Sequence, residues 1–352
     1  MSDKKTTYRE HTDMENTLKL RQVLATLPPF CKDYFRAIDT TTTAKTRISY
    51  AYDIRIFFQF LLDENPAFKD HAMTDFTVDV LDQIKAVDLE EYQEYLKLYQ
   101  SGDKTETNGE RGLKRKISAL RSFYAYYYKR EMIHTNPTVL IDVPKIHEKS
   151  IIRLDTDEVA MLLDYIEHCG DTLTGQKRVF YEKTKERDLA IVTLLLGTGI
   201  RVSECVGLDI EDVDFKNNGI KVTRKGGNEM VGYFGPEVEK ALKRYLEVRE
   251  GITPLAGHEH ALFYSAQRKR IGVQAVENMV KKYSRQITTT KKITPHKLRS
   301  TYGTALYQET GDIYLVADVL GHKDVNTTKK HYAALDDARR RQAATAVKLR
   351  EE

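Results

Sequence analysis

The sequence predicts a mainly α-helical protein of two domains, with a small antiparallel β-sheet in the second domain. The chain has 352 residues, a length typical of two domains. Apolar residues recur at positions i, i+3, i+4 and i+7 in several segments, which indicates amphipathic helices. One stretch, 212–235, instead combines alternating apolar residues with two turn signals, a pattern typical of antiparallel strands.

The first half of the chain is predicted to be helical throughout. Residues 1–40 are expected to form an extension with one or two helices, and residues 41–142 a small helical bundle. Three segments carry the helical spacing: Ile54, Phe57, Phe58 and Leu61; Leu89, Tyr92, Leu96 and Tyr99; Ile117, Leu120, Tyr124 and Tyr127. The stretch 143–152 contains Pro144 and has no periodicity, so we expect it to be a linker.

Residues 153–352 are predicted to form the second domain. An apolar run, Leu189–Leu196, indicates a buried helix, and the Gly-Thr-Gly that follows it predicts a break before a short helix that starts at Arg201. The strands of the sheet are expected at 220–223 and 230–234, with a helical pattern on either side.

The composition indicates a globular protein with little net charge. Charged residues make up 31% and hydrophobic residues 41% of the chain, and the formal net charge is +4. The three cysteines lie far apart and form no CxxC pair, which argues against a zinc knuckle or a disulfide framework and suits a reducing compartment. We find no secretory signal and no apolar run of the roughly 20 residues that span a bilayer. We therefore expect a cytoplasmic protein with no membrane insertion.

Positive charge is concentrated in two segments. Residues 111–130 contain seven basic and no acidic residues, and residues 268–299 contain ten basic residues and one acidic residue. Two cationic segments, one in each domain, fit a nucleic-acid backbone, whereas the alternative is two solvated helix faces. The candidate DNA contacts are Lys114, Arg115, Lys116 and Arg121.

Three segments of the second domain carry candidate phosphate-binding and acid–base residues. Arg201 follows two glycines at a predicted helix start, where Glu204 is able to pair with it. His296 and Arg299 are three residues apart in a helix that Thr294 would cap, so they share a face. His322 follows Gly321, the predicted C′ residue of another helix. Taken singly, each of these segments also fits an ordinary surface ion pair or helix end.

A metal site has weak support in the sequence. Only Gly257-His258-Glu259-His260 resembles a cluster of metal ligands, and it lacks the H-E-x-x-H spacing on a helix. We interpret this segment as an exposed loop.

Taken together, these residues resemble the active-site motifs of the tyrosine recombinase (phage integrase) family. The order is Arg201, Lys225 in a Thr-Arg-Lys-Gly-Gly turn, His296-x-x-Arg299, Leu-Gly-His322 and Tyr332. A single motif would be weak evidence for the resemblance, but five motifs in the family's order and spacing are strong evidence. Within the family, the chain looks most similar to Xer recombinases of the stand-alone XerS type. It departs from many members at Ser300, where they have a histidine, and in the ten positions from His322 to Tyr332, where many Xer proteins have nine.

The resemblance implies an architecture and a reaction. Residues 41–142 would be a SAM-like core-binding domain and 153–352 the catalytic domain, and together they would form a C-shaped clamp on double-stranded DNA. Tyr332 would attack the scissile phosphate to give a 3′-phosphotyrosyl link, without a metal or other cofactor. The other implied roles are transition-state stabilisation by Arg201 and Arg299, supported by Glu204, general-acid catalysis by Lys225, and general-base or phosphate contacts from His296 and His322.

The resemblance also implies partners and a biological role. Four subunits would assemble on synapsed DNA, each through a C-terminal helix that docks on its neighbour, although this tail also fits a frayed helix. A septal DNA translocase or another accessory protein is a further expected partner. The main hypothesis is resolution of chromosome dimers at a dif-like site. The alternatives are an integrase or excisionase of a phage or conjugative element, and a catalytically silent DNA-binding protein.

Overall fold

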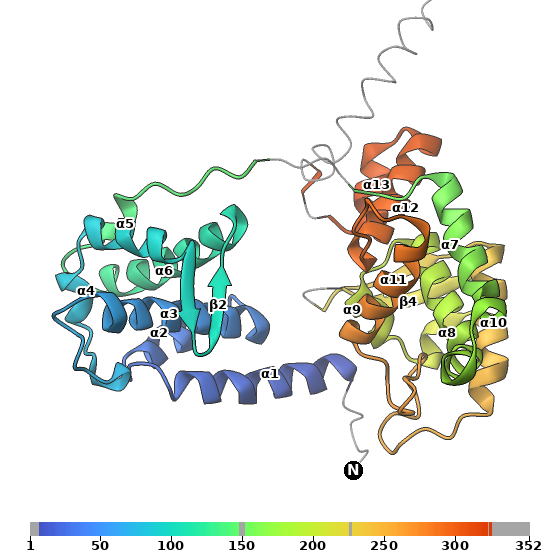
Figure 1. Ribbon diagram of the computed structural model, residues 1–352, viewed down its shortest axis with the longest axis horizontal. Coiled ribbons are helices and arrows are strands. Elements are labelled where there is room, and N and C mark those ends of the chain that lie inside the picture. Colours follow the sequence, from blue (N-terminus) through green and yellow to red (C-terminus); the bar gives the residue numbers. More distant parts are fainter. Residues whose placement is uncertain (1–6, 148–151, 225–226, 323, 326–352) are drawn as a thin grey trace, which may run out of the picture. The chain divides into compact units, whose positions relative to one another are not determined.

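The computed structural model describes residues 7–147, 152–224, 227–322 and 324–325. The chain divides into two compact units, residues 1–148 and 149–352 (Figure 1). Lys225 and Tyr332, two of the predicted site residues, lie outside the described residues, as does the C-terminal tail. Among the helices described, none combines the length and apolar character that crossing a membrane requires.

The first unit is mainly helical. Its helices are α1 (Tyr8–Leu24), α2 (Cys31–Ala37), α3 (Ala44–Glu64), α4 (Val80–Gln83), α5 (Ala86–Tyr95) and α6 (Glu110–Tyr128), with 3-10 turns η1 (Met73–Asp75) and η2 (Pro137–Val139). Helix α3 contacts α1, α5 and α6. The predicted helices around Ile54–Leu61 and Ile117–Tyr127 are confirmed as α3 and α6.

An aromatic core holds these helices together. Phe58 and Phe123 meet edge to face across α3 and α6, with ring centroids 6.3 Å apart. The segment before residue 41 belongs to the same core, because Tyr34 is fully buried and its hydroxyl donates to Ser122 Oγ at 2.9 Å. Tyr127, also buried, donates to the carbonyl of Phe30 at 2.8 Å. The tyrosines at 124 and 127 are therefore core residues, as their helical spacing indicates.

The first unit also contains a β-hairpin that the helical spacing did not predict. Strands β1 (Leu98–Ser101) and β2 (Lys104–Thr107) pair antiparallel, and Ser101 faces Lys104 across a two-residue turn. The prediction of helix as far as Tyr99 was wrong, because α5 ends at Tyr95. Gly102 supplies the turn with a φ of +59°, which side chains disfavour. The apolar spacing that predicted a helix continues by coincidence into the first strand of the hairpin.

The second unit places its helices around a long central helix. Its elements are α7 (Thr156–His168), η3 (Cys169–Thr172), α8 (Gly175–Thr198), α9 (Val202–Gly207), η4 (Ile210–Asp212), β3 (Val213–Asp214), β4 (Gly219–Thr223), β5 (Glu229–Tyr233), α10 (Pro236–Glu250), α11 (Val273–Ile287), α12 (Pro295–Thr310) and α13 (Ile313–Leu320). Helix α8 contacts α7, α10 and α12, which explains why its apolar run 189–195 is buried from end to end.

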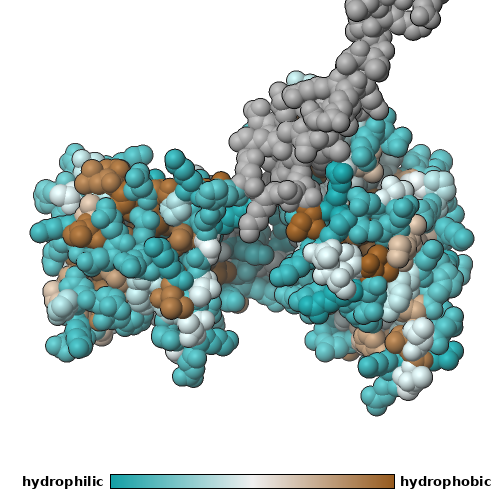
Figure 2. Space-filling view, turned by 45° about the horizontal axis from the view of Figure 1, so that its top comes forward, coloured by the Kyte–Doolittle hydropathy of each residue, from teal (hydrophilic) through white to brown (hydrophobic). Residues whose placement is uncertain are grey.

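The predicted sheet is confirmed. Strands β3, β4 and β5 form one antiparallel sheet in that order, and Ile220 pairs with Gly232. Its apolar residues face the interior on alternate positions, since Ile220 and Val222 are buried while Lys221 is exposed. Hydrophilic side chains dominate the face of the molecule in Figure 2, with scattered hydrophobic groups between them.

Two glycines end the helices that lead to the predicted site. Gly199 ends α8 with a φ of +64°, and a Cβ there would overlap the ring of Tyr302. Gly321 ends α13 with a φ of +61°, as its predicted C′ position requires. Gly199 lies two residues before Arg201, and Gly321 lies directly before His322.

Candidate active site

Arg201 is held at the start of α9 by Glu204. The backbone N–H of Arg201 donates to Glu204 Oε2 at 2.7 Å, and its Nη1 donates to Oε1 at 2.8 Å. The Glu204 side chain is 5% exposed and that of Arg201 is 37% exposed. The buried carboxylate therefore fixes the guanidinium, while the Arg201 side chain as a whole is only partly buried.

Arg299 is buried on α12 and links the ends of two other helices. Its Nη1 donates to the carbonyl of Gly199, at the end of α8, and its Nη2 donates to the carbonyl of Leu320, at the end of α13. A guanidinium offers five donors in a rigid fork, and two of them bind these carbonyls. The positions of α8, α12 and α13 are thereby tied to one charged group.

His322 lies on the turn that follows α13. Its N–H donates to Ala317 O at 2.9 Å, and the Gly321 N–H donates to Asp318 O at 2.8 Å. Arg201 reaches the same turn, because its Nη2 donates to Gly321 O at 3.4 Å. The structure thus brings Arg201, Arg299 and the turn of His322 together, although they are far apart in the sequence.

His296 lies in the first turn of α12, and its side chain is exposed. The predicted helix start is confirmed, with Thr294 in the extended cap position and Pro295 as the first helical residue. The expected cap bond from the Thr294 side chain is absent from the structure. The Thr294 carbonyl accepts from the N–H of Lys297 at 2.7 Å and begins the helix without it.

Sequence reasoning missed Arg224. This residue follows β4 directly, and its guanidinium lies at the C-terminal end of α13, where it donates to Val319 O at 2.6 Å and to Asp318 O at 3.2 Å. Burial lowers the pKa of Arg224, and the nearby charge of Arg201 lowers it further, while Glu204 and Asp318 act in the opposite direction. The only signal in the sequence was its place beside Lys225 in a turn rich in glycine.

The four candidate DNA contacts on α6 differ in their surroundings. Lys114 is exposed, and Arg115, 46% exposed, pairs with the buried Asp53. Lys116 is 6% exposed, and its Nζ donates to Asn108 Oδ1 at 2.9 Å. The side chain of Arg121 donates to two main-chain carbonyls: Thr138 O at 3.0 Å and Ile141 O at 2.6 Å.

These contacts separate the basic side chains of α6 into two kinds. The ammonium of Lys116 and the guanidinium of Arg121 bind partners within the first unit, which argues against direct contact of Lys116 with a phosphate. Lys114 and Arg115 extend to the surface and remain the candidates for DNA. Helical spacing accounts for the difference, because Lys116 lies on the buried face with Leu113 and Ile117.

The second basic segment is divided in the same way. Arg270 donates to the carbonyls of Val206 and Leu208 and pairs with Asp209, so it fixes the chain after α9. In contrast, the basic side chains of α11 at 281, 282 and 285 are exposed. Those on α11 remain available to a phosphate backbone.

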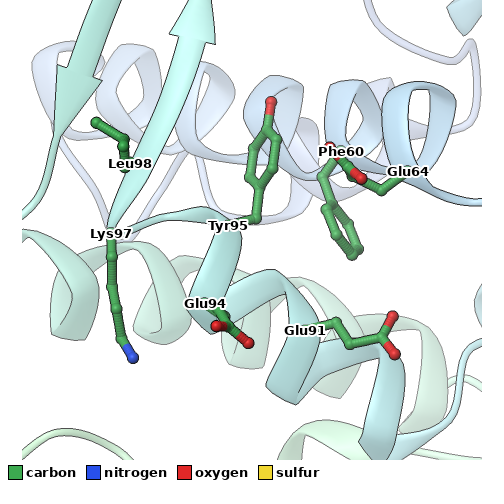
Figure 3. A pocket seen from close by; sticks show the side chains of 7 residues that line it. All are labelled: Phe60, Glu64, Glu91, Glu94, Tyr95, Lys97 and Leu98. Atoms are coloured by element: carbon green, nitrogen blue, oxygen red, sulfur yellow. The ribbon is translucent and has the colours of Figure 1, made fainter.

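Two other features contain none of the predicted catalytic residues. In the 257–260 loop, His260 pairs with Glu211, and within the described part of the chain no three His, Cys, Asp or Glu side chains converge as metal ligands. Figure 3 shows a surface hollow of the first unit that acidic and aromatic side chains surround: Phe60, Glu64, Glu91, Glu94, Tyr95, Lys97 and Leu98.

Comparison with known proteins identifies the class. Residues 152–339 match the Phage integrase family. The chain is 33% identical over 336 residues to tyrosine recombinase XerC of Caldanaerobacter subterraneus subsp. tengcongensis, covering 92% of this chain and 88% of that protein. It is 31% identical to tyrosine recombinase XerS of Lactococcus lactis subsp. cremoris, covering 90% and 93%.

Solved structures share the fold. The XerH site-specific recombinase bound to palindromic difH substrate aligns with a TM-score of 0.61 at 21% identity, covering 86% of this chain and 79% of that one. A lambda integrase dimer bound to a COC′ core site gives a TM-score of 0.61 at 16% identity, covering 86% and 94%. The chain belongs to the phage integrase family. More closely, it is similar to the Xer tyrosine recombinases, and like them it is a site-specific DNA recombinase.

Proposed function

We propose that this protein resolves chromosome dimers by recombination at a dif-like site, through a 3′-phosphotyrosyl intermediate. The observation that carries the chemistry is the convergence of Arg201, Arg299 and the His322 turn at the ends of α8 and α13. The biological role is supported by the similarity to XerC and XerS over about nine-tenths of the chain, and by the fold shared with XerH bound to difH.

Two arginines stabilise the phosphoryl transition state in this proposal. Negative charge gathers on the non-bridging oxygens as the nucleophile attacks, and guanidinium groups bind such oxygens with paired, charge-assisted hydrogen bonds. Arg201 and Arg299 are already fixed by Glu204 and by the carbonyls of Gly199 and Leu320. Removing one such preorganised donor typically costs about 10²–10³ in rate.

The nucleophile is Tyr332, by the family motif. Its phenolic oxygen forms a bond to phosphorus while the bond from phosphorus to the 5′ oxygen breaks, so the energy of the phosphodiester is retained and no nucleotide is consumed. A phenol with a pKa near 10 needs a base at neutral pH, and His296 is our candidate, with His322 donating to the phosphate. The leaving 5′ oxygen takes a proton from Lys225.

DNA is held by both units in this proposal. Residues 41–142 form the core-binding domain, with Lys114 and Arg115 on its DNA face, and residues 153–352 form the catalytic domain, joined by a linker at 143–152. Four subunits on two synapsed sites complete the exchange in the cytoplasm. A free 5′-hydroxyl from the partner strand attacks the phosphotyrosyl link and restores a phosphodiester.

A nicked suicide duplex tests this proposal. The protein is incubated with a duplex that carries its host's candidate dif-like site and a nick beside the scissile phosphate, so that the cleaved strand diffuses away. We expect a covalent adduct on a denaturing gel, no adduct with Tyr332→Phe, and none with a scrambled site. An adduct that survives Tyr332→Phe would contradict the mechanism. If the protein cleaved the ends of a mobile element but not the chromosomal site, its proposed role would be integration of that element and not resolution of chromosome dimers.

A further inference from the structure

We propose that Arg224 is a positioning residue that ties the end of β4, directly before Lys225 in the sequence, to the His322 turn at the end of α13. The inference rests on the proposed function, because it concerns delivery of the proton to the leaving 5′ oxygen. It concerns a residue to which the family resemblance assigned no role, and it follows from hydrogen bonds of both the main chain and the side chain of Arg224.

The main chain of Arg224 closes its own turn. Its N–H donates to Asn228 O at 2.7 Å, and its carbonyl accepts from the Gly227 N–H at 3.0 Å. These bonds continue the β4–β5 ladder by one step beyond Thr223, where the pairing of Thr223 with Glu229 ends. The backbone that leads directly into Lys225 is therefore fixed at Arg224.

The side chain of Arg224 is fixed at α13. It donates to the carbonyls of Asp318 and Val319, which belong to the last turn of that helix. The last carbonyls of a helix lack partners within it and carry the negative end of the helix dipole, so a cation that hydrogen-bonds them is stabilised. A planar, forked guanidinium is able to bind two successive carbonyls at once, whereas a lysine ammonium is a single point of charge.

Three arginines together donate to the whole of this helix end. Each carbonyl from 318 to 321 receives a bond from a guanidinium: Arg224 binds those of Asp318 and Val319, Arg299 that of Leu320, and Arg201 that of Gly321. The family resemblance implies a role for Arg201 and Arg299, but it assigned none to Arg224. Arg224 binds carbonyls of the same helix end, and in the sequence it directly precedes Lys225, the residue proposed as general acid.

Gly321 is matched to Arg224. A Cβ at position 321 would overlap the Arg224 guanidinium, so the turn and the side chain are packed against each other. Arg224 thus joins the end of β4 to the His322 turn. Lysine has a long and flexible side chain, and fixing the residue before it reduces the range of positions from which its ammonium delivers a proton.

Two suicide substrates isolate this role. One carries the ordinary scissile phosphodiester, and the other a sulfur in place of the bridging 5′ oxygen. A thiolate leaves without a proton at neutral pH, since thiols ionise near a pKa of about 8.5, so the second substrate needs no general acid. The variants are Arg224→Gln, Arg224→Lys and Lys225→Ala, with Arg201→Lys as the control for a residue that acts on the phosphate.

We expect Arg224→Gln to slow single-turnover cleavage of the ordinary substrate by about 10²-fold, the loss typical of a displaced catalytic group. On the sulfur substrate its rate should return to within about threefold of wild type, as for Lys225→Ala, whereas Arg201→Lys stays slow on both. Arg224→Lys should recover part of the loss. An Arg224→Gln defect that is equal on the two substrates, or no defect on either, would overturn the inference. An inactive wild type would instead contradict the proposed function.

Hydrogen exchange on the DNA-free protein tests the tether without any activity. Arg224→Gln should speed amide exchange at both 219–233 and 313–322, because the bonds that join these segments are lost. Exchange in α7, to which none of these Arg224 bonds goes, serves as the internal control. Unchanged exchange at both segments would show that Arg224 does not hold them together. This result would not depend on the DNA substrate of the recombinase or on the proposed function.

Discussion

Glu204 binds Arg201 at two points, the backbone N–H at 2.7 Å and the guanidinium at 2.8 Å. The first bond completes the start of α9 and the second orients the side chain, so one buried carboxylate sets both the backbone and the charge of the residue. Neighbouring cations compensate the burial of Glu204, which would otherwise be costly.

Glu204→Gln should slow cleavage while leaving DNA affinity near wild type. The amide keeps an acceptor for one bond but loses the charge that holds the guanidinium, so Arg201 should lose orientation at the phosphate. We expect a loss of about tenfold in the single-turnover cleavage rate, below the full loss of an oxyanion donor. The control is Glu239→Gln on α10, which pairs with the exposed Lys243. A wild-type rate in Glu204→Gln would remove Glu204 from the site.

Gly321→Ala should reduce both stability and cleavage. Alanine at a φ of +61° costs about 1 kcal/mol or more, and its Cβ would also displace Arg224. Gly102→Ala is the matched control, because its φ is +59° but nothing lies within 4 Å of the added Cβ. Urea titrations of both variants separate the backbone cost from the crowding. Equal losses of stability in the two would show that Arg224 does not pack against Gly321.

The sequence was sufficient to predict those parts of the site that depend on local spacing. Gly199 and Gly321 lie at helix ends where the backbone adopts a positive φ, a conformation that glycine accepts readily. Arg201 reaches Glu204 because a spacing of three residues brings two side chains together at a helix start. The convergence of Arg201 and Arg299 with the His322 turn was predicted only through the family resemblance. Spacing alone does not show that helices 100 residues apart meet.

Contacts between distant segments explain what was missed. Lys116 lies in a run of basic residues that is typical of a DNA-binding face. Its partners, however, are Asn108 and Asp53, and Asp53 lies on α3, distant in the sequence but adjacent in space. Arg224 resembles any cation beside a turn until α13 is placed against it. In both cases the charge of the residue is evident in the sequence, whereas its acceptor is defined only by tertiary packing.

Lys114→Gln and Lys116→Gln should differ in their effect on DNA binding. Lys114 is exposed on α6, so its loss should weaken binding and reduce the slope of log K against log salt by about 1, the value for one phosphate contact. Lys116→Gln should leave that slope unchanged and lower stability instead, since it leaves Asp53 short of a partner. Fluorescence anisotropy over a range of salt concentrations measures both slopes. A reduced slope in Lys116→Gln alone would contradict the assignment made from burial.

Asp53→Asn should change how stability depends on pH. Asp53 is 2% exposed, and its burial raises its pKa to about 6, although Arg115 and Lys116 act to lower it. Between the unfolded pKa of about 3.9 and this value, the folded state binds more protons than the unfolded state, so the contribution of Asp53 to stability is lost as pH rises through about 6.

The asparagine amide of the variant cannot ionise. The free energy of unfolding of Asp53→Asn minus that of wild type should therefore increase between pH 4 and pH 7, by up to about 3 kcal/mol. Urea titrations across this range measure the difference, with Asp103→Asn in the exposed β1–β2 turn as the control. A difference that stays constant or shrinks would show that Asp53 is ionised in the folded protein throughout, held by Arg115 and Lys116.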